Sequence, residues 1–113
     1  MTTIHDFLLA RGYRGGHRDP RHESGVLYHR IVGGHPKPCL CNGKLQLCAI
    51  VYEFEYSGQE HRSVTFEITG EYREGAWAKL EAYAVSFERA IDECERIEND
   101  LLRAWSAMYG AAS

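Results

Sequence analysis

The chain has 113 residues, 44% of them hydrophobic, and a formal net charge of −3 at pH 7. This size and composition fit a single globular domain with one modest core, residues 1–113, and no apolar run approaches the ~20 residues needed to cross a bilayer. The first residues hold only a short apolar stretch broken by charges, which excludes a secretory signal, so we expect a cytoplasmic protein.

The small net charge hides an uneven distribution. Residues 1–48 carry seven Arg or Lys against three Asp or Glu, whereas residues 49–113 carry six basic and thirteen acidic side chains. The first part is therefore +4 and the second −7. A chain of this kind offers a basic patch and an acidic face to different partners.

The first predicted element is a short helix over "TTIHDFLLARG", residues 2–12. Thr3 is a suitable N-cap, an apolar stripe begins at Ile4, and Gly12 is a suitable stop. Residues 12–25 are rich in Gly, Arg and His and have little to bury. They are predicted to form a flexible loop.

An antiparallel β-meander of about four strands is predicted over residues 26–69. Alternating β-branched residues indicate a first strand over 26–32. Asn42-Gly43 is a favoured pair for a two-residue type I′ hairpin turn, because both positions need a positive φ. A long strand then runs from Lys44 to about Tyr56.

The hydrophobic pattern also predicts how this strand pairs with the next, residues 61–69. Even-numbered apolar residues share one face in both strands (Ile50, Tyr52, Phe54; Val64, Phe66, Ile68). Opposed residues of an antiparallel pair lie on the same side, so the connecting loop should hold an odd number of residues, 57–59 or 57–61. This register directs Glu53, Glu55 and Glu67 outward.

Residues 71–109 are predicted to form one long helix or a helix pair. Apolar residues recur there at intervals of three and four, interrupted only by Glu98 (Trp77, Leu80, Ala84, Phe87, Ile91, Cys94, Leu101, Trp105, Met108). Such a helix would reach ~50 Å, beyond the ~27 Å of an eight-residue strand. It should therefore break near Asn99-Asp100 or pair its C-terminal half with a second copy in a homodimer.

These elements give an α+β fold, with a short N-terminal helix, an antiparallel β-meander, and a long C-terminal helix packed on the sheet.

A histidine and three cysteines between residues 35 and 48 raise the question of a metal site. Cys39, Cys41 and Cys48 lie on one side of the predicted hairpin, and His35 would supply a fourth ligand to zinc. A Cys-x-Cys pair lacks the spacing of a zinc knuckle, however, and a free cysteine packs as a small apolar residue. We expect core cysteines and no cofactor, with a structural zinc as the alternative.

No catalytic motif is present. The sequence lacks a Walker loop, a dinucleotide-binding glycine fingerprint, a nucleophile elbow and a His-Glu-x-x-His helix. A general base requires an orienting partner, and His17, His22 and His35 lie in or beside predicted loops. His29 on a predicted strand could be held by such a partner, but an exposed position on the sheet is favoured. We therefore expect a protein that is not an enzyme and has no catalytic residues.

Two charged surfaces are candidates for partner binding. Carboxylates on the sheet and the helix would imitate a row of phosphates for a basic, nucleic-acid-binding protein (Glu53, Glu55, Glu67, Glu81, Glu88, Glu95). The N-terminal loop combines arginines with an aromatic ring, which suits phosphates and stacking (Tyr13, Arg14, Arg18, Arg21). Because the chain is acidic overall, a protein partner is favoured over direct binding of nucleic acid.

In size, charge layout and general plan the chain resembles small phage-borne inhibitors of host defence, the anti-CRISPR proteins. The resemblance implies a stoichiometric inhibitor, acting in the host cytosol, that occupies the nucleic-acid site of a CRISPR effector complex. Two alternatives remain: a small zinc-stabilised, nucleic-acid-associated domain, or a homodimeric accessory or structural protein.

Overall fold

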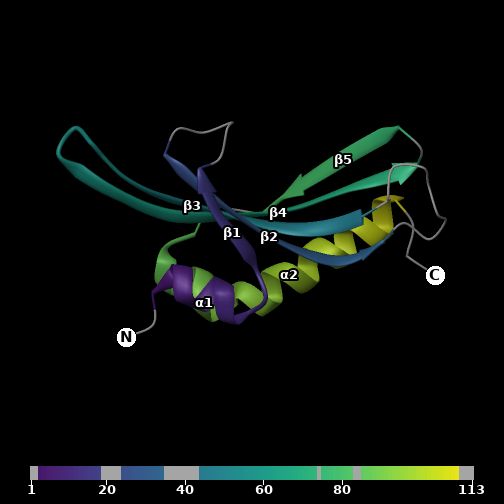
Figure 1. Ribbon diagram of the computed structural model, residues 1–113, viewed down its shortest axis with the longest axis horizontal. Helices are drawn as coiled ribbons and strands as arrows, with labels where there is room; N and C mark the ends of the chain where they lie inside the picture. Colours follow the sequence, from purple (N-terminus) through teal and green to yellow (C-terminus); the bar gives the residue numbers. More distant parts are fainter. Residues whose placement is uncertain (1–2, 19–23, 35–43, 74, 83–84, 110–113) are drawn as a thin grey trace.

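The computed structural model describes residues 3–18, 24–34, 44–73, 75–82 and 85–109. Its elements, in chain order, are α1 (Ile4–Ala10), β1 (Arg14–Arg18), β2 (Gly25–Gly34), β3 (Lys44–Tyr56), β4 (Gln59–Arg73), β5 (Ala76–Glu81) and α2 (Phe87–Tyr109). The strands form one antiparallel meander in the order β1-β2-β3-β4-β5, and both helices lie on the same face of the sheet (Figure 1). The predicted α+β class is confirmed, with five strands instead of about four.

The core lies between the sheet and the two helices. The helix-facing side of β3 and β4 contributes six residues that are almost completely buried (Leu47, Ala49, Val51, Val64, Phe66, Ile68). From α2 come residues that recur every three or four positions (Ala90, Cys94, Ile97, Leu101, Trp105). Ile4 and Leu8 of α1 complete the layer.

The start of α1 follows the prediction. The Thr3 side-chain oxygen accepts a hydrogen bond from the Asp6 backbone N–H at 3.1 Å, which satisfies one of the free N–H groups of the first turn. The helix ends at Ala10, and Gly12 follows with a φ of +95°. That angle suits glycine and turns the chain into β1.

The prediction of a loop over residues 12–25 is wrong for Arg14–Arg18, which form the edge strand β1. All five of these residues are exposed, so β1 has no hydrophobic pattern to reveal it. Its glycines make the pairing with β2 possible. Gly15 has a φ of +127°, and a Cβ there would lie 2.5 Å from the Leu27 carbonyl oxygen, at a bulge in the register.

The predicted pairing of β3 with β4 is also wrong. The turn consists of Ser57 and Gly58 alone, with φ angles of 52° and 79°. These positive angles are those of a two-residue hairpin turn, and they bring Tyr56 opposite Gln59. Odd-numbered residues of β3 therefore face even-numbered residues of β4, as Val51 faces Val64. The helix-facing side of β3 is its odd-numbered side, and Phe54 lies on the opposite face, 39% exposed.

The helix predicted from residue 71 begins only at Phe87. Residues Ala76–Glu81 form β5, in which Trp77 is 56% exposed and Leu80 is half-buried. The alternating exposure of this segment is the period of a strand. Ser86 caps α2, because its Oγ accepts a hydrogen bond from the Arg89 backbone N–H at 3.3 Å.

The C-terminal half of α2 packs on the sheet of its own chain. The helix continues without a break through Asn99-Asp100. Trp105 is 7% exposed and lies so close to β4 that a Cβ on Gly70 would be 3.0 Å from its ring. The Tyr72 and Tyr109 rings stack with centroids 4.7 Å apart. The stripe that suggested a homodimer is thus largely buried within one chain.

Within the described ranges, no helix is both long enough and apolar enough to span a membrane.

Candidate functional site

The outer part of the β3–β4 hairpin extends beyond the two-layer body of the molecule. Figure 1 shows it projecting past both helices, with its tip at the far left. Every residue from Glu53 to Arg62 is exposed, although the strand pairing continues to Tyr56 and Gln59. We call residues 53–62 the arm. Because it continues two core strands, the arm has a defined backbone without a core of its own.

The arm has one charged face and one aromatic face, because side chains alternate along each strand. Glu53 lies opposite Arg62 and Glu55 opposite Glu60. Both glutamates lie on the side where the helices lie, so the prediction that they point to the other face of the sheet is wrong, although both are exposed. The other face pairs Phe54 with His61 and Tyr56 with Gln59.

The two aromatic residues of the arm are large exposed hydrophobic groups. The Phe54 and His61 rings stack at 4.9 Å with an interplanar angle of 17°. Tyr56, nearest the turn, is 70% exposed. Exposed aromatic rings on an ordered backbone are characteristic of surfaces that become buried on binding.

Three carboxylates and one arginine give the arm a negative charge. Arg62 Nη2 lies 3.7 Å from Glu60 Oε2, but both side chains are largely exposed. A solvent-exposed pair of this kind contributes little to stability. The charged face therefore remains available to a basic partner.

The six predicted acidic residues do not form one surface. Glu53 and Glu55 lie on the arm, and Glu88 is exposed near its base, in the first turn of α2. Glu95 is exposed further along α2. The remaining two, Glu67 and Glu81, lie opposite each other on β4 and on the edge strand β5.

Glu67 and Glu81 share one lysine. Glu67 lies on the face away from the helices, as predicted, but it is only 2% exposed, so it does not belong to an exposed acidic surface. Its Oε2 lies 3.9 Å from Lys79 Nζ, and Glu81 Oε1 lies 2.9 Å from the same nitrogen. Glu81 belongs to β5 and not to a helix. The lysine offsets the repulsion between these two opposed carboxylates.

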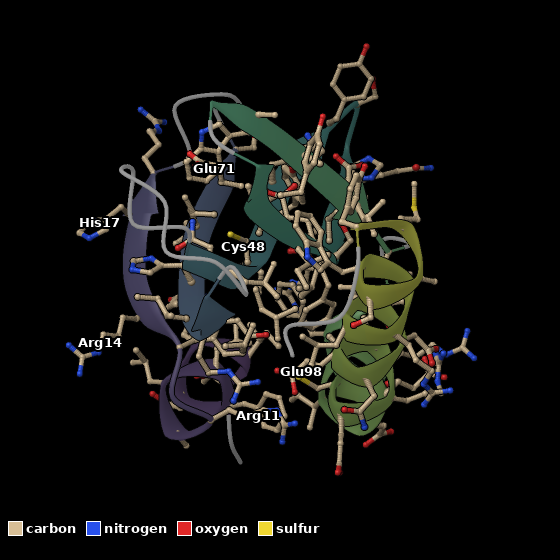
Figure 2. All side chains as sticks on the ribbon, turned by 90° about the vertical axis from the view of Figure 1, so that its right-hand side faces the viewer. Arg11, Arg14, His17, Cys48, Glu71 and Glu98 are labelled. Carbon is tan, nitrogen blue, oxygen red and sulfur yellow. The ribbon has the colours of Figure 1, made fainter. Side chains whose placement is uncertain are left out.

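The predicted basic surface is divided as well. Arg14 and Arg18 are exposed on β1, and Arg14 and His17 point away from the sheet in Figure 2. Tyr13 is 1% exposed and is not available to stack on a base. Arg21 lies outside the described residues.

The zinc hypothesis involves mainly residues that the structure does not describe: His35, Cys39 and Cys41. Cys48 is buried in β3, where Leu47 to Val51 are buried on both faces of the sheet. It lies on the face opposite the helices, because the register differs from the predicted one. In the described part of the chain, no group of three or more His, Cys, Asp or Glu is placed to hold a metal.

A buried polar network joins both helices to the sheet at Glu98 of α2. Arg11 donates to Glu98 Oε1 through Nε at 3.1 Å and also through Nη2. Tyr13 donates its hydroxyl to Oε2 at 2.8 Å, and Arg30 Nη2 lies 3.0 Å from the same oxygen. Figure 2 shows Arg11 and Glu98 directed toward each other at the base of the molecule. The Arg30 guanidinium also lies 5.3 Å from the Tyr13 ring centre.

The network fixes the charges of its members. Burial acts to raise the pKa of Glu98, but the hydrogen bonds from Arg11 and Tyr13 and the two guanidinium charges outweigh it and lower the pKa. Burial and the adjacent Glu98 carboxylate raise the pKa of Tyr13, which keeps its hydroxyl proton. Burial also raises the pKa of Cys94 to about 12, so its thiol is not a nucleophile near neutral pH. A carboxylate that is ionised near neutral pH and bonded to the side chains of Arg11, Tyr13 and Arg30 has a structural role.

No family model, no curated protein and no solved structure matches this chain.

Proposed function

We propose that the chain is a non-enzymatic protein-binding module that acts by covering a basic surface of its partner. The observation that supports this proposal is the arm. It carries Phe54, Tyr56 and three carboxylates on an ordered hairpin that makes no contribution to the core.

The physical chemistry of interfaces favours this surface over the others. Aromatic residues are enriched at protein–protein contacts, and a small number of them provide most of the binding energy. A backbone that is already ordered loses little conformational entropy on binding. The carboxylates of the charged face would speed the approach of a basic partner and limit which partners bind.

The resemblance to phage-borne inhibitors indicates which partners to assay first. Nucleic-acid-guided defence complexes hold nucleic acid in a positively charged channel, and in this proposal the acidic arm enters that channel. In this form of the proposal, the chain competes with nucleic acid for the channel and catalyses nothing.

The test is affinity capture from host lysate with three baits, followed by measurement of affinity with the purified partner. The first bait is the wild-type chain, and the second carries Phe54→Ser and Tyr56→Ser. The third, a matched control, carries Met108→Ser at the far end of α2, where the side chain is 61% exposed. We expect the arm variant to bind the partner at least about tenfold more weakly, as loss of a central aromatic contact implies.

A partner held equally well by all three baits would overturn the proposal. The proposal would also be overturned if the chain bound an oligonucleotide, and if that binding were lost on replacing Arg14 and Arg18 with alanine but unaffected in the arm variant.

A separate experiment, in which Glu53 and Glu55 are replaced by lysine, tests the contribution of charge to partner binding. We expect a slower association rate and a weaker dependence on salt. Glu67 is left unchanged, because it is buried.

A further inference from the structure

A groove lies at the base of the arm, between the starts of the two helices. It has a volume of about 840 Å³ and is lined by the first residues of α1, by Glu53 and Arg62 of the arm, and by the first turns of α2. Pockets that take drug-sized ligands fall in the same size range. The groove is therefore large enough for a segment of several residues.

Three hydrophobic residues form the apolar part of the groove. Ile4 is 3% exposed, whereas Phe87 and Ile91 are half-buried and lie one helical turn apart on the same side of α2. Phe87 and Ile91 pack against the core on one side and are open to the groove on the other. An apolar side chain from a partner would remove the rest of their surface from water.

Three carboxylates surround this apolar area: Glu53, Glu88 and Asp92. All three are exposed, and none forms an ion pair with another described residue. Arg62 also lines the groove, with its guanidinium 3.7 Å from Glu60. The charged side chains of the groove therefore have a negative balance, and positive groups on a ligand would complement it.

We propose that this groove binds a segment of the partner protein in which a bulky apolar side chain is flanked by lysine or arginine. The apolar side chain contacts Phe87 and Ile91, and the cations lie among Glu53, Glu88 and Asp92. This inference rests on the proposed function, because it assigns the groove to the same partner that meets the arm. Glu53 belongs to both surfaces, so a ligand in the groove is continuous with one along the charged face of the arm.

The direct test uses synthetic peptides as probes and NMR spectra of the isotope-labelled full chain. The first peptide has a central Phe-Leu pair flanked by lysines. In the second, glutamates replace the lysines, and in the third, serines replace the Phe-Leu pair. We expect saturable shifts of the Ile4 and Ile91 methyl signals with the first peptide alone. A chain carrying Glu88→Gln and Asp92→Asn should bind it at least about tenfold more weakly, and Glu95→Gln is the matched control.

The inference would be overturned if the first peptide caused no shifts at concentrations up to about 5 mM. Such a result would mean that any dissociation constant lies in the millimolar range or above. Equal shifts with the glutamate peptide, or an unchanged affinity in the double variant, would also overturn it.

A second measurement separates the two proposals. If the captured partner binds the groove double variant normally but loses affinity for the Phe54→Ser, Tyr56→Ser chain, then the proposed function stands and the groove inference fails. If neither variant weakens the partner, the proposed function itself fails. All four substituted side chains are exposed, so we expect both variants to stay folded. Thermal melts of the two variants check that a loss of binding is not caused by unfolding.

Discussion

Replacement of Glu98 by glutamine tests the main polar contact between the helices and the sheet. Glutamine keeps the size of the side chain and one acceptor oxygen, and it removes the negative charge. The Arg11 and Arg30 guanidinium groups then face a neutral amide, and Tyr13 loses a charged acceptor. The substitution therefore isolates the contribution of charge from that of packing.

The expected loss of unfolding free energy follows from the burial of the pair. Removing one partner of a buried ion pair costs about 3–5 kcal/mol, and a hydrogen bond to a charged group contributes about 1.5–3 kcal/mol. The Glu98 side chain is 3% exposed, but Arg11 and Arg30 remain 30% exposed, so water solvates part of their charge. We expect a loss of about 2–3 kcal/mol, or about 8–12 °C in Tm.

The effect depends on pH in a definite direction. The folded pKa of Glu98 lies below its ordinary value of 4.5. Its charge therefore stabilises the fold fully above pH 4.5, and that contribution is lost as the pH falls through the folded pKa. The difference in stability between the wild-type chain and the variant should be largest near neutral pH and should shrink on acidification.

Urea unfolding followed by circular dichroism, at neutral pH and at a series of acidic pH values, measures both quantities. Glu95→Gln, an exposed substitution on the same helix, is the control and should change stability by less than about 0.5 kcal/mol. The reasoning would be refuted by a Glu98→Gln chain as stable as this control, or by a difference that stays constant at acidic pH.

Three further outcomes are expected. Gly70→Ala places a Cβ 2.8 Å from Leu45 Cδ1 and 3.0 Å from the Trp105 ring and should cost about 1–3 kcal/mol in urea melts; unchanged stability would mean that Leu45 and α2 do not approach this position so closely. Gly15→Ala forces a residue with a φ of +127° against the Leu27 carbonyl and should detach β1, seen as fast amide exchange there with the core still protected. Slow exchange in that variant would contradict the bulge. Cys94, with its pKa raised to about 12, should resist iodoacetamide at pH 8 until urea unfolds the chain, as mapped by mass spectrometry. Labelling of the native chain would show that the thiol is accessible.

The sequence predicts the class of this fold because its longest elements have clear periods. The strand from Lys44 to Tyr56 and the stripe from Cys94 to Trp105 follow periods of two and of three to four. The N-cap at Thr3 depends only on residues next to it in the chain, so it can be recognised in the sequence. Each of these features was identified without reference to distant residues.

The wrong predictions, for the register of β3 and β4 and for the strands β5 and β1, have physical causes that the pattern of apolar residues does not reveal. Ser57 adopts a positive φ that is unusual for serine, and the two-residue turn that it forms with Gly58 sets the register of β3 against β4. In β5, Trp77 and Leu80 are three residues apart, a spacing that fits a helix as well as a short strand. β1 pairs through its backbone while all its side chains remain exposed.

The candidate site was predicted only in part. Glu53, Glu55 and Glu88 are exposed around the arm and its groove, as an acidic surface requires. Glu67 is buried, although it lies on the face of β4 away from the helices, where it pairs with Glu81 and has Lys79 within 3.9 Å. Glu98 was visible as an interruption of the helix stripe, but its partners Arg11 and Tyr13 lie 87 and 85 positions away in the sequence. Only the folded chain identifies them.

The two-residue turn at Ser57-Gly58 affects how the hairpin can evolve. Adding or deleting one residue on each side of the turn lengthens or shortens the hairpin by one rung, about 3.4 Å, and leaves the pairing of the interior strands unaltered. Exposed positions also tolerate substitution at small energetic cost. The length and side chains of the projecting tip can therefore change at little cost in stability, whereas the close packing of the scaffold beneath it restricts which substitutions fit.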